Sequence, residues 1–231
     1  MRRVISMKPE ISSFSLGFND CYVIQEQGVI MIDSGPPGKR ADFVRVLKNI
    51  PLRPEDIKLI VMTDGHPDHI GSARDIKDLT NARIAMHRLS KSCLEAGEWR
   101  KMHVPGGRLG NAIFRRIMVW SSGEIPPAEV DLVIEDSGLF LKDYGVSGRI
   151  LYTPGHTLGS ISVLLDSGDA FVGDLAMNKL PFRFRPGLPT IAEDKVKVRE
   201  SWRKLLELGA TTVYPAHGKP FSAEVIKRAL K

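Results

Sequence analysis

The chain of 231 residues lacks the features that mark disulfide-rich and membrane-spanning proteins. Its two cysteines, Cys21 and Cys93, are too few for a disulfide framework, so we expect reduced thiols and a cytoplasmic protein. No uncharged apolar run approaches the roughly 18 residues that a membrane-spanning helix needs, so we expect no membrane partner. Charged residues and a proline at positions 8–10 interrupt the N-terminal segment, and we therefore expect no secretory signal.

The composition of the chain is that of an ordinary globular protein, with 42% hydrophobic and 26% charged residues. We find no internal repeat and no linker, and we predict a single domain over residues 1–231. The net charge of +6 is uneven, because residues 179–231 hold 12 Lys and Arg against 5 Asp and Glu. This excess is typical of solvated helix faces; attraction for an anionic substrate or nucleic acid is the alternative interpretation.

Short β-branched runs alternate with amphipathic stretches along the chain, a pattern that indicates sheets covered by helices. Residues 99–128 are rich in Gly, Pro and Arg and are predicted to form an insertion, either a lid or a surface excursion. Helices are predicted over residues 40–48, 68–79, 90–100, 109–119, 193–208 and 223–230. Strands are predicted over residues 21–24, 29–33, 59–63, 83–87, 132–134, 149–153, 161–165, 170–174 and 211–214.

Five of the predicted strands run into a turn that contains Gly or Pro and carries an aspartate or a histidine. The residues in these positions include Asp33, His66, His156, Asp174 and His217. Side chains at the ends of neighbouring strands converge on one edge of a sheet, where open sheets commonly place active sites. We therefore expect these side chains to meet in one site.

The densest group of such residues is the segment Asp64-Gly-His66-Pro-Asp68-His69. In an extended stretch, residues two apart point to the same side, so Asp64 and His66 can face one centre. Past Pro67 the chain can enter a helix, and Asp68 and His69 then point in new directions. Two histidines and two aspartates at this spacing favour a dinuclear metal site with nitrogen and oxygen ligands. A helix cap with unrelated histidines is the alternative, but burying so many uncompensated polar groups would be costly.

This segment resembles the His-x-His-x-Asp-His signature of the metallo-β-lactamase superfamily, and the other four strand ends match that family's remaining motifs in order. The resemblance covers nearly the whole chain, from Asn19 to Gly218. It implies an α/β (α+β) fold of the αββα type, in which two mixed sheets face each other with helices on the outer faces. It also implies a metallo-hydrolase with two divalent metal ions, zinc ahead of iron or manganese, at one edge of the sandwich.

Carried over by motif, the resemblance implies that His66 and His156 bind the first metal. Asp174 would bridge the two metals, and Asp33 would orient ligands through hydrogen bonds. Water or hydroxide between the metals would be the nucleophile, and Asp68 would orient it or assist proton transfer. The second metal would have three ligands of its own: Asp68, His69 and His217.

The sequence departs from the family signature at its first histidine, which is Asp64 here. Aspartate can still bind zinc, but it is a harder and anionic ligand that improves the prospects of iron or manganese. We expect Asp64 to act as a metal ligand. A mononuclear enzyme with a weak first site and a non-catalytic binding protein that keeps the fold are the alternatives.

The segment after Asp174 contains Arg183 and Arg185, which are predicted to clamp a substrate carboxylate or phosphate; a surface loop with solvated arginines is the alternative. His87 is expected to pack in the fold, and His103 in the insertion is expected to be solvated.

Only 14 residues follow His217, so we expect the glutathione-binding helical segment of glyoxalase II-like enzymes to be missing. The predicted activity is hydrolysis of a small-molecule ester, lactone or thioester, with an anionic substrate preferred. A phosphodiesterase acting on nucleotides or RNA is the alternative enzyme, although nucleic acid is not the expected partner. A homodimer is the default expectation for an oligomer.

Overall fold

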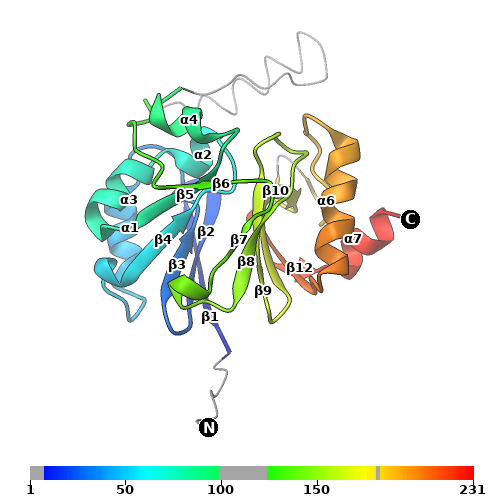
Figure 1. The fold of residues 1–231 in the computed structure, drawn as a ribbon, viewed down its shortest axis with the longest axis horizontal. Helices are drawn as coiled ribbons and strands as arrows, with labels where there is room; N and C mark the ends of the chain where they lie inside the picture. The colour runs from blue at the N-terminus through cyan, green and yellow to red at the C-terminus, as the bar shows by residue number, and fades with distance from the viewer. Residues whose placement is uncertain (1–7, 99–123, 181–182) are drawn as a thin grey trace.

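The computed structural model describes residues 8–98, 124–180 and 183–231. Within these ranges the strands form two six-stranded sheets that face each other. Figure 1 shows helices α1 and α3 outside one sheet and helices α6 and α7 outside the other. The predicted αββα sandwich is therefore confirmed.

The first sheet is antiparallel at one side and parallel at the other. Its order is β1-β2-β3-β4-β5-β6, with antiparallel pairing from β1 to β3 and parallel pairing from β3 to β6. Its strands are β1 (Glu10–Leu16), β2 (Asn19–Gln25), β3 (Val29–Ile32), β4 (Ile57–Val61), β5 (Arg83–His87) and β6 (Leu132–Ile134).

The second sheet has one parallel pair, β10 with β11, among antiparallel neighbours. Its order is β12-β11-β10-β9-β8-β7. Its strands are β7 (Leu139–Phe140), β8 (Gly148–Tyr152), β9 (Ile161–Leu165), β10 (Asp169–Met177), β11 (Thr212–His217) and β12 (Phe221–Ser222).

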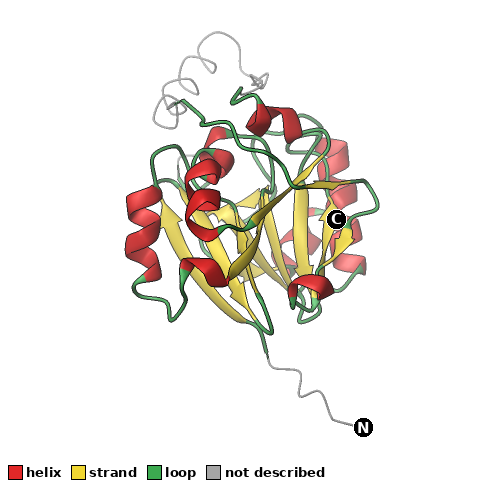
Figure 2. Cartoon of the chain, turned by 60° about the vertical axis from the view of Figure 1, so that its left-hand side comes forward, coloured by secondary structure: helices red, strands yellow, loops and turns green. Residues whose placement is uncertain are grey.

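The helices lie on the outer faces and at the upper edge of the sandwich, as Figure 2 shows in red against the yellow strands. The longest of them, α6 (Lys195–Glu207), begins after Asp194, whose carboxylate accepts the backbone N–H groups of Val196 and Lys197. The remaining helices are α1 (Arg40–Leu47), α2 (Pro67–Ile70), α3 (Ala73–Thr80), α4 (Lys91–Glu95) and α7 (Glu224–Ala229), with 3-10 turns η1 (Pro54–Asp56) and η3 (Lys142–Tyr144). None of the described helices combines the length and the hydrophobicity that a transmembrane segment requires.

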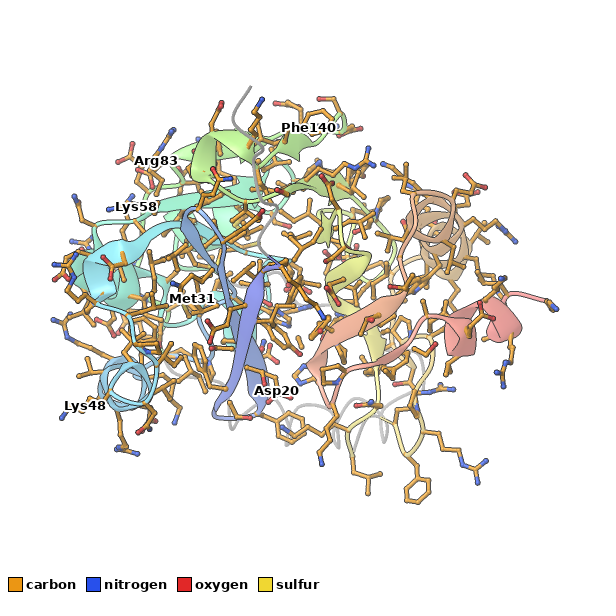
Figure 3. The ribbon with its side chains drawn as sticks, turned by 90° about the horizontal axis from the view of Figure 1, so that it is seen from below. Asp20, Met31, Lys48, Lys58, Arg83 and Phe140 are labelled. Atoms are coloured by element: carbon orange, nitrogen blue, oxygen red, sulfur yellow. The ribbon has the colours of Figure 1, made fainter. Side chains whose placement is uncertain are left out.

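The core has an apolar layer between the sheets and one more on each outer face. Strand β3 shows how the sequence builds them: Met31 packs on the helix side, whereas Ile30 and Ile32 pack toward the other sheet. A strand buried on both faces reads as an uninterrupted apolar run, as this one does. In Figure 3, Met31 lies among the interior side chains, whereas Lys48 lies at the periphery.

The structure corrects several predicted boundaries. The predicted helix 68–79 is two helices, α2 and α3, because Gly71 and Ser72 separate them and the backbone of Gly71 packs against Pro37. The predicted helix 90–100 ends at Glu95 among the described residues, before Gly97 adopts a positive φ of 63°. The predicted helix 109–119 and residues 99–123 of the predicted insertion lie outside the described residues.

Sequence reasoning missed three strands, β1, β7 and β12. Strand β1 has three serines and a half-exposed surface, so it carries little of the apolar signal that marks an inner strand. Strands β7 and β12 have only two residues each, too few to show a periodicity.

Candidate metal centre

The carboxyl ends of β3, β4, β8 and β11 and the second half of β10 bring the predicted site residues to one edge of the sandwich. There α2 follows the turn after β4, and Figure 1 shows it at the upper end of the strands. The ligand atoms fall into two groups in which the atoms lie within 4.8 Å of one another. The first cluster is Asp64, His66, His156 and Asp174, and the second cluster is Asp68, His69 and His217.

The first cluster surrounds a small volume with four donor atoms. His66 Nδ1 lies 3.0 Å from Asp64 Oδ2 and 3.3 Å from His156 Nε2. His156 Nε2 in turn lies 3.7 Å from Asp64 Oδ2 and 3.3 Å from Asp174 Oδ2. Asp64 therefore takes part in this cluster although it stands where the family signature has histidine.

The second cluster shares Asp174 with the first. His217 Nε2 lies 3.1 Å from Asp68 Oδ2 and 3.3 Å from Asp174 Oδ1, and His69 Nε2 lies 3.7 Å from the same Asp174 oxygen. Asp174 thus presents Oδ2 to the first cluster and Oδ1 to the second. A carboxylate in this position is suited to bridge two metal ions.

These donors fit divalent metal ions on two grounds. Ligand atoms about 2.0–2.1 Å from a tetrahedral ion lie about 3.3 Å from one another, which matches the measured separations of 3.0 to 3.7 Å. His69 Nε2 is buried and has no hydrogen-bond partner among the described residues. A buried nitrogen without a partner is costly unless something else binds it, and a cation would do so.

Three of the imidazoles are oriented by protein oxygens on their outer side. His69 Nδ1 lies 2.8 Å from Asp33 Oδ2, His156 Nδ1 lies 2.9 Å from the carbonyl oxygen of Ile191, and His217 Nδ1 lies 3.3 Å from that of Phe18. When Nδ1 donates to these oxygens, Nε2 carries a lone pair toward the cluster, the state that a metal ligand requires.

Asp33 lies where the resemblance placed it, behind His69 rather than in a cluster. Its carboxylate accepts both the backbone N–H and the hydroxyl of Thr63, at 2.8 Å each. Its backbone has a positive φ of 57°, a conformation that non-glycine residues seldom adopt. Sequence reasoning missed Thr63, although as the last residue of a predicted strand it stood directly before the metal-binding segment.

The electrostatics of the site favour bound positive charge. Burial raises the pKa of Asp174, but the imidazoles of His217 and His156 outweigh burial and hold this pKa well below its ordinary value. Burial lowers the pKa of His217, but the carboxylates of Asp174 and Asp68 outweigh it and raise the pKa to about 10. Asp33, Asp64, Asp68 and Asp174 are all buried, so two divalent cations would balance their four negative charges.

The predicted substrate clamp shows no contact with either cluster among the described residues. The Arg183 guanidinium donates to the carbonyl oxygens of Arg185 and Leu188, at 2.7 and 3.2 Å, and Arg185 is exposed. A clamp by these two arginines stays a prediction. Sequence reasoning did not single out Lys179, which donates to the Phe18 carbonyl and lies over the Phe18 ring, itself 5.4 Å from the His217 ring.

Of the two histidines outside the clusters, His87 and His103, only His87 lies among the described residues. His87 packs in the fold as expected, stacked on the ring of Tyr152 at 4.3 Å. His103 lies outside the described residues.

Comparison with known proteins agrees with the class that this fold and site define, an αββα protein with paired histidine–carboxylate clusters. Residues 15–217 match the metallo-beta-lactamase superfamily. A metallo-beta-lactamase fold-containing protein of Sulfurisphaera tokodaii, ST1585, is 27% identical over 209 residues, which are 89% of this chain and 74% of that protein. The mouse metallo-beta-lactamase domain-containing protein 1 is 26% identical over 215 residues. The match covers 89% of this chain but only 64% of the mouse protein's length.

Solved structures share the fold. The BLEG-1 B3 metallo-beta-lactamase superposes with a TM-score of 0.69 at 20% identity, covering 93% of this chain and 95% of that one. The crystal structure of ST1585 gives a TM-score of 0.68 at 24% identity, covering 95% and 84%. The chain belongs to the metallo-beta-lactamase superfamily.

Proposed function

We propose that the protein is a metal-dependent hydrolase that cleaves a small ester, lactone or thioester at the paired clusters. The observation that carries the proposal is the position of Asp174, whose two carboxylate oxygens face different clusters at 3.3 Å from His156 and His217. A carboxylate shared in this way supports a site for two neighbouring divalent ions. Such ions, when bound, make water nucleophilic near neutral pH and polarise the bond that is cleaved.

The protein's own side chains have distinct tasks in this proposal. His66, His156, His69 and His217 hold the ions, while Asp33 keeps the His69 ring in its orientation. Asp68 Oδ2 lies 3.1 Å from His217 Nε2, so Asp68 stands beside the reacting atoms and can orient the attacking water or accept its proton.

Asp64 makes the two clusters chemically alike. Each cluster has two imidazoles and one carboxylate of its own, and Asp174 lies 3.3 Å from a histidine of each. Zinc satisfies this donor set, and the added carboxylate favours iron or manganese more than three imidazoles would. The superfamily supports several chemistries, so the donor set names the reaction class and not the substrate.

The test combines metal analysis with a substrate panel. We expect about two divalent ions per chain in protein purified without added metal, measured by elemental analysis. The loaded protein is then assayed against esters, lactones, thioesters and a phosphodiester, with His66→Ala and His156→Ala as inactive variants. Asp78→Asn, at an exposed residue of α3, is the matched control and should keep full activity.

Two results would contradict the proposal. Full activity in both histidine variants would show that hydrolysis does not depend on the first cluster. Cleavage of the phosphodiester alone would replace the proposed substrate class with the nucleotide or RNA alternative.

A further inference from the structure

A pocket opens beside the first cluster, with His66 and Gly65 in its lining. The loop after β5 supplies Leu89 to its walls, and α4 supplies Cys93. The loop after His156 supplies Leu158, and Glu193 before α6 completes the pocket. A small molecule in this pocket therefore touches a residue of the metal centre.

The walls of the pocket combine apolar groups with one negative charge. Leu89 and Leu158 are 38% and 46% exposed, and their side chains leave apolar surface open to a ligand. Glu193 contributes a carboxylate, and among the described residues no lysine or arginine lines the pocket. A ligand with a carboxylate would meet like charge here, whereas an uncharged alkyl group would gain apolar contact.

Two hydrogen bonds hold the backbone of Leu158 in the pocket wall, one at its N–H and one at its carbonyl oxygen. Its N–H donates to Glu193 Oε2 at 2.7 Å, and its carbonyl accepts the Tyr152 hydroxyl at 3.0 Å. Glu193 thus combines two features: it supplies the negative charge and it positions the apolar wall.

Leu89, in the opposite wall of the pocket, is also held through Tyr152. The Leu89 N–H donates to Nδ1 of His87, at 3.4 Å, and the His87 ring stacks on Tyr152 at 4.3 Å. Burial lowers the pKa of His87, which keeps the neutral imidazole available as an acceptor. One ring stack therefore supports both leucine walls, so the pocket is shaped before a ligand arrives.

We propose that this pocket binds an uncharged alkyl part of the substrate and that Glu193 excludes a carboxylate from it. The proposal rests on the proposed hydrolase function and narrows the substrate class. The substrate has at least one end that is apolar and carries no negative charge. An anionic group on the other end would lie away from this pocket, on the side of the second cluster where Lys179 stands beside Phe18.

The Cys93 thiol allows a test that does not depend on hydrolysis, because Cys93 lines the pocket and is 6% exposed, whereas Cys21 is 0% exposed. The rates of Cys93 alkylation by neutral iodoacetamide and anionic iodoacetate are measured by mass spectrometry. Each rate is divided by that of a free thiol in solution. We expect the neutral reagent to be favoured at least about fivefold, from the repulsion between two nearby charges.

Glu193→Gln should bring this ratio close to one, because glutamine keeps an oxygen acceptor for the Leu158 N–H but removes the charge. Glu200→Gln, at an exposed residue of α6, is the matched control and should leave the ratio unchanged. Equal rates in the unmodified protein, or no alkylation of Cys93 by either reagent, would overturn the proposal.

A second test uses three esters of similar size: ethyl butyrate, monoethyl succinate and carboxymethyl butyrate. Each charged ester carries its carboxylate on a different side of the cleaved bond. We expect kcat/KM to fall at least about fivefold for one charged ester only, and Glu193→Gln to restore it. Equal penalties for both charged esters, or a penalty that Glu193→Gln does not relieve, would contradict the role of Glu193.

The variant Tyr152→Phe tests whether Tyr152 positions Leu158 separately from its contribution to the stability of the fold. It keeps the aromatic ring that stacks on His87 and removes only the hydroxyl group that donates to the Leu158 carbonyl. We expect KM to rise for butyrate esters with little change for acetate esters and with unchanged metal content. If no ester is cleaved but Cys93 still reacts faster with iodoacetamide than with iodoacetate, the proposed hydrolase function is wrong. The exclusion of a carboxylate from the pocket by Glu193 would still hold.

Discussion

The two clusters have the same donor set but different surroundings. In the second cluster, His69 and His217 are 0% and 1% exposed, and the Asp33 carboxylate, which accepts from Thr63, supports the His69 ring from behind. In the first cluster, His66 is 6% exposed and lines a pocket. One histidine of the second cluster is therefore held by a buried carboxylate, whereas one histidine of the first cluster faces the pocket.

The largest expected effect comes from the residue that the clusters share. Asp174→Asn removes the charge that both clusters use, so we expect both metal ions to be lost and activity to fall more than about 100-fold. Elemental analysis and kcat/KM measure the two effects, with Asp78→Asn as the surface control. Retention of one full equivalent of metal would show that Asp174 does not link the clusters.

Removal of metal with a chelator should lower the melting temperature in calorimetry. Ions that bind only the native state stabilise it by mass action, about 2.7 kcal/mol for each site that is loaded at 100 times its dissociation constant. The shift in Asp174→Asn should be close to zero. The same chelator-induced shift in both proteins would mean that the ions bind elsewhere.

A smaller and one-sided effect is expected from Asp33→Asn, because Asp33 supports only the second cluster. Loss of such a support typically weakens metal affinity by about 10- to 100-fold. Competition with a chromogenic chelator should show one weakened ion and one unchanged ion per chain. Equal weakening of both would mean that the clusters are not independently supported.

The smallest effect is expected where Asp64→His replaces the carboxylate of the first cluster with an imidazole. We expect a shift in metal preference from manganese or iron toward zinc, confined to one ion, and a fall in activity. Metal competition followed by the ester assay measures both. A large rise in metal affinity and activity would instead mark Asp64 as a weakened ligand.

Much of the site was predictable because its residues follow strands. Short and mostly apolar runs precede Asp33, Asp64, Asp174 and His217, and the ends of neighbouring strands lie along one edge. The local pattern was weakest in the polar strand β1 and in the two-residue strands β7 and β12. The division of α2 from α3 at Gly71 and Ser72 was also missed; there the backbone of Gly71 packs against Pro37, which is distant in the sequence.

The hydrophobic pattern of the sequence indicated sheets covered by helices, because periodicity is a local property of the chain. The resemblance of its motifs to a known family implied the two facing sheets and the members of the metal centre. Only the tertiary structure decided that Asp64 faces His156 and that Asp174 divides its oxygens between the clusters. The same holds for the pocket, where Leu158 and Glu193 are 35 residues apart. Such contacts depend on how the two sheets and α6 pack, and no local pattern encodes that packing.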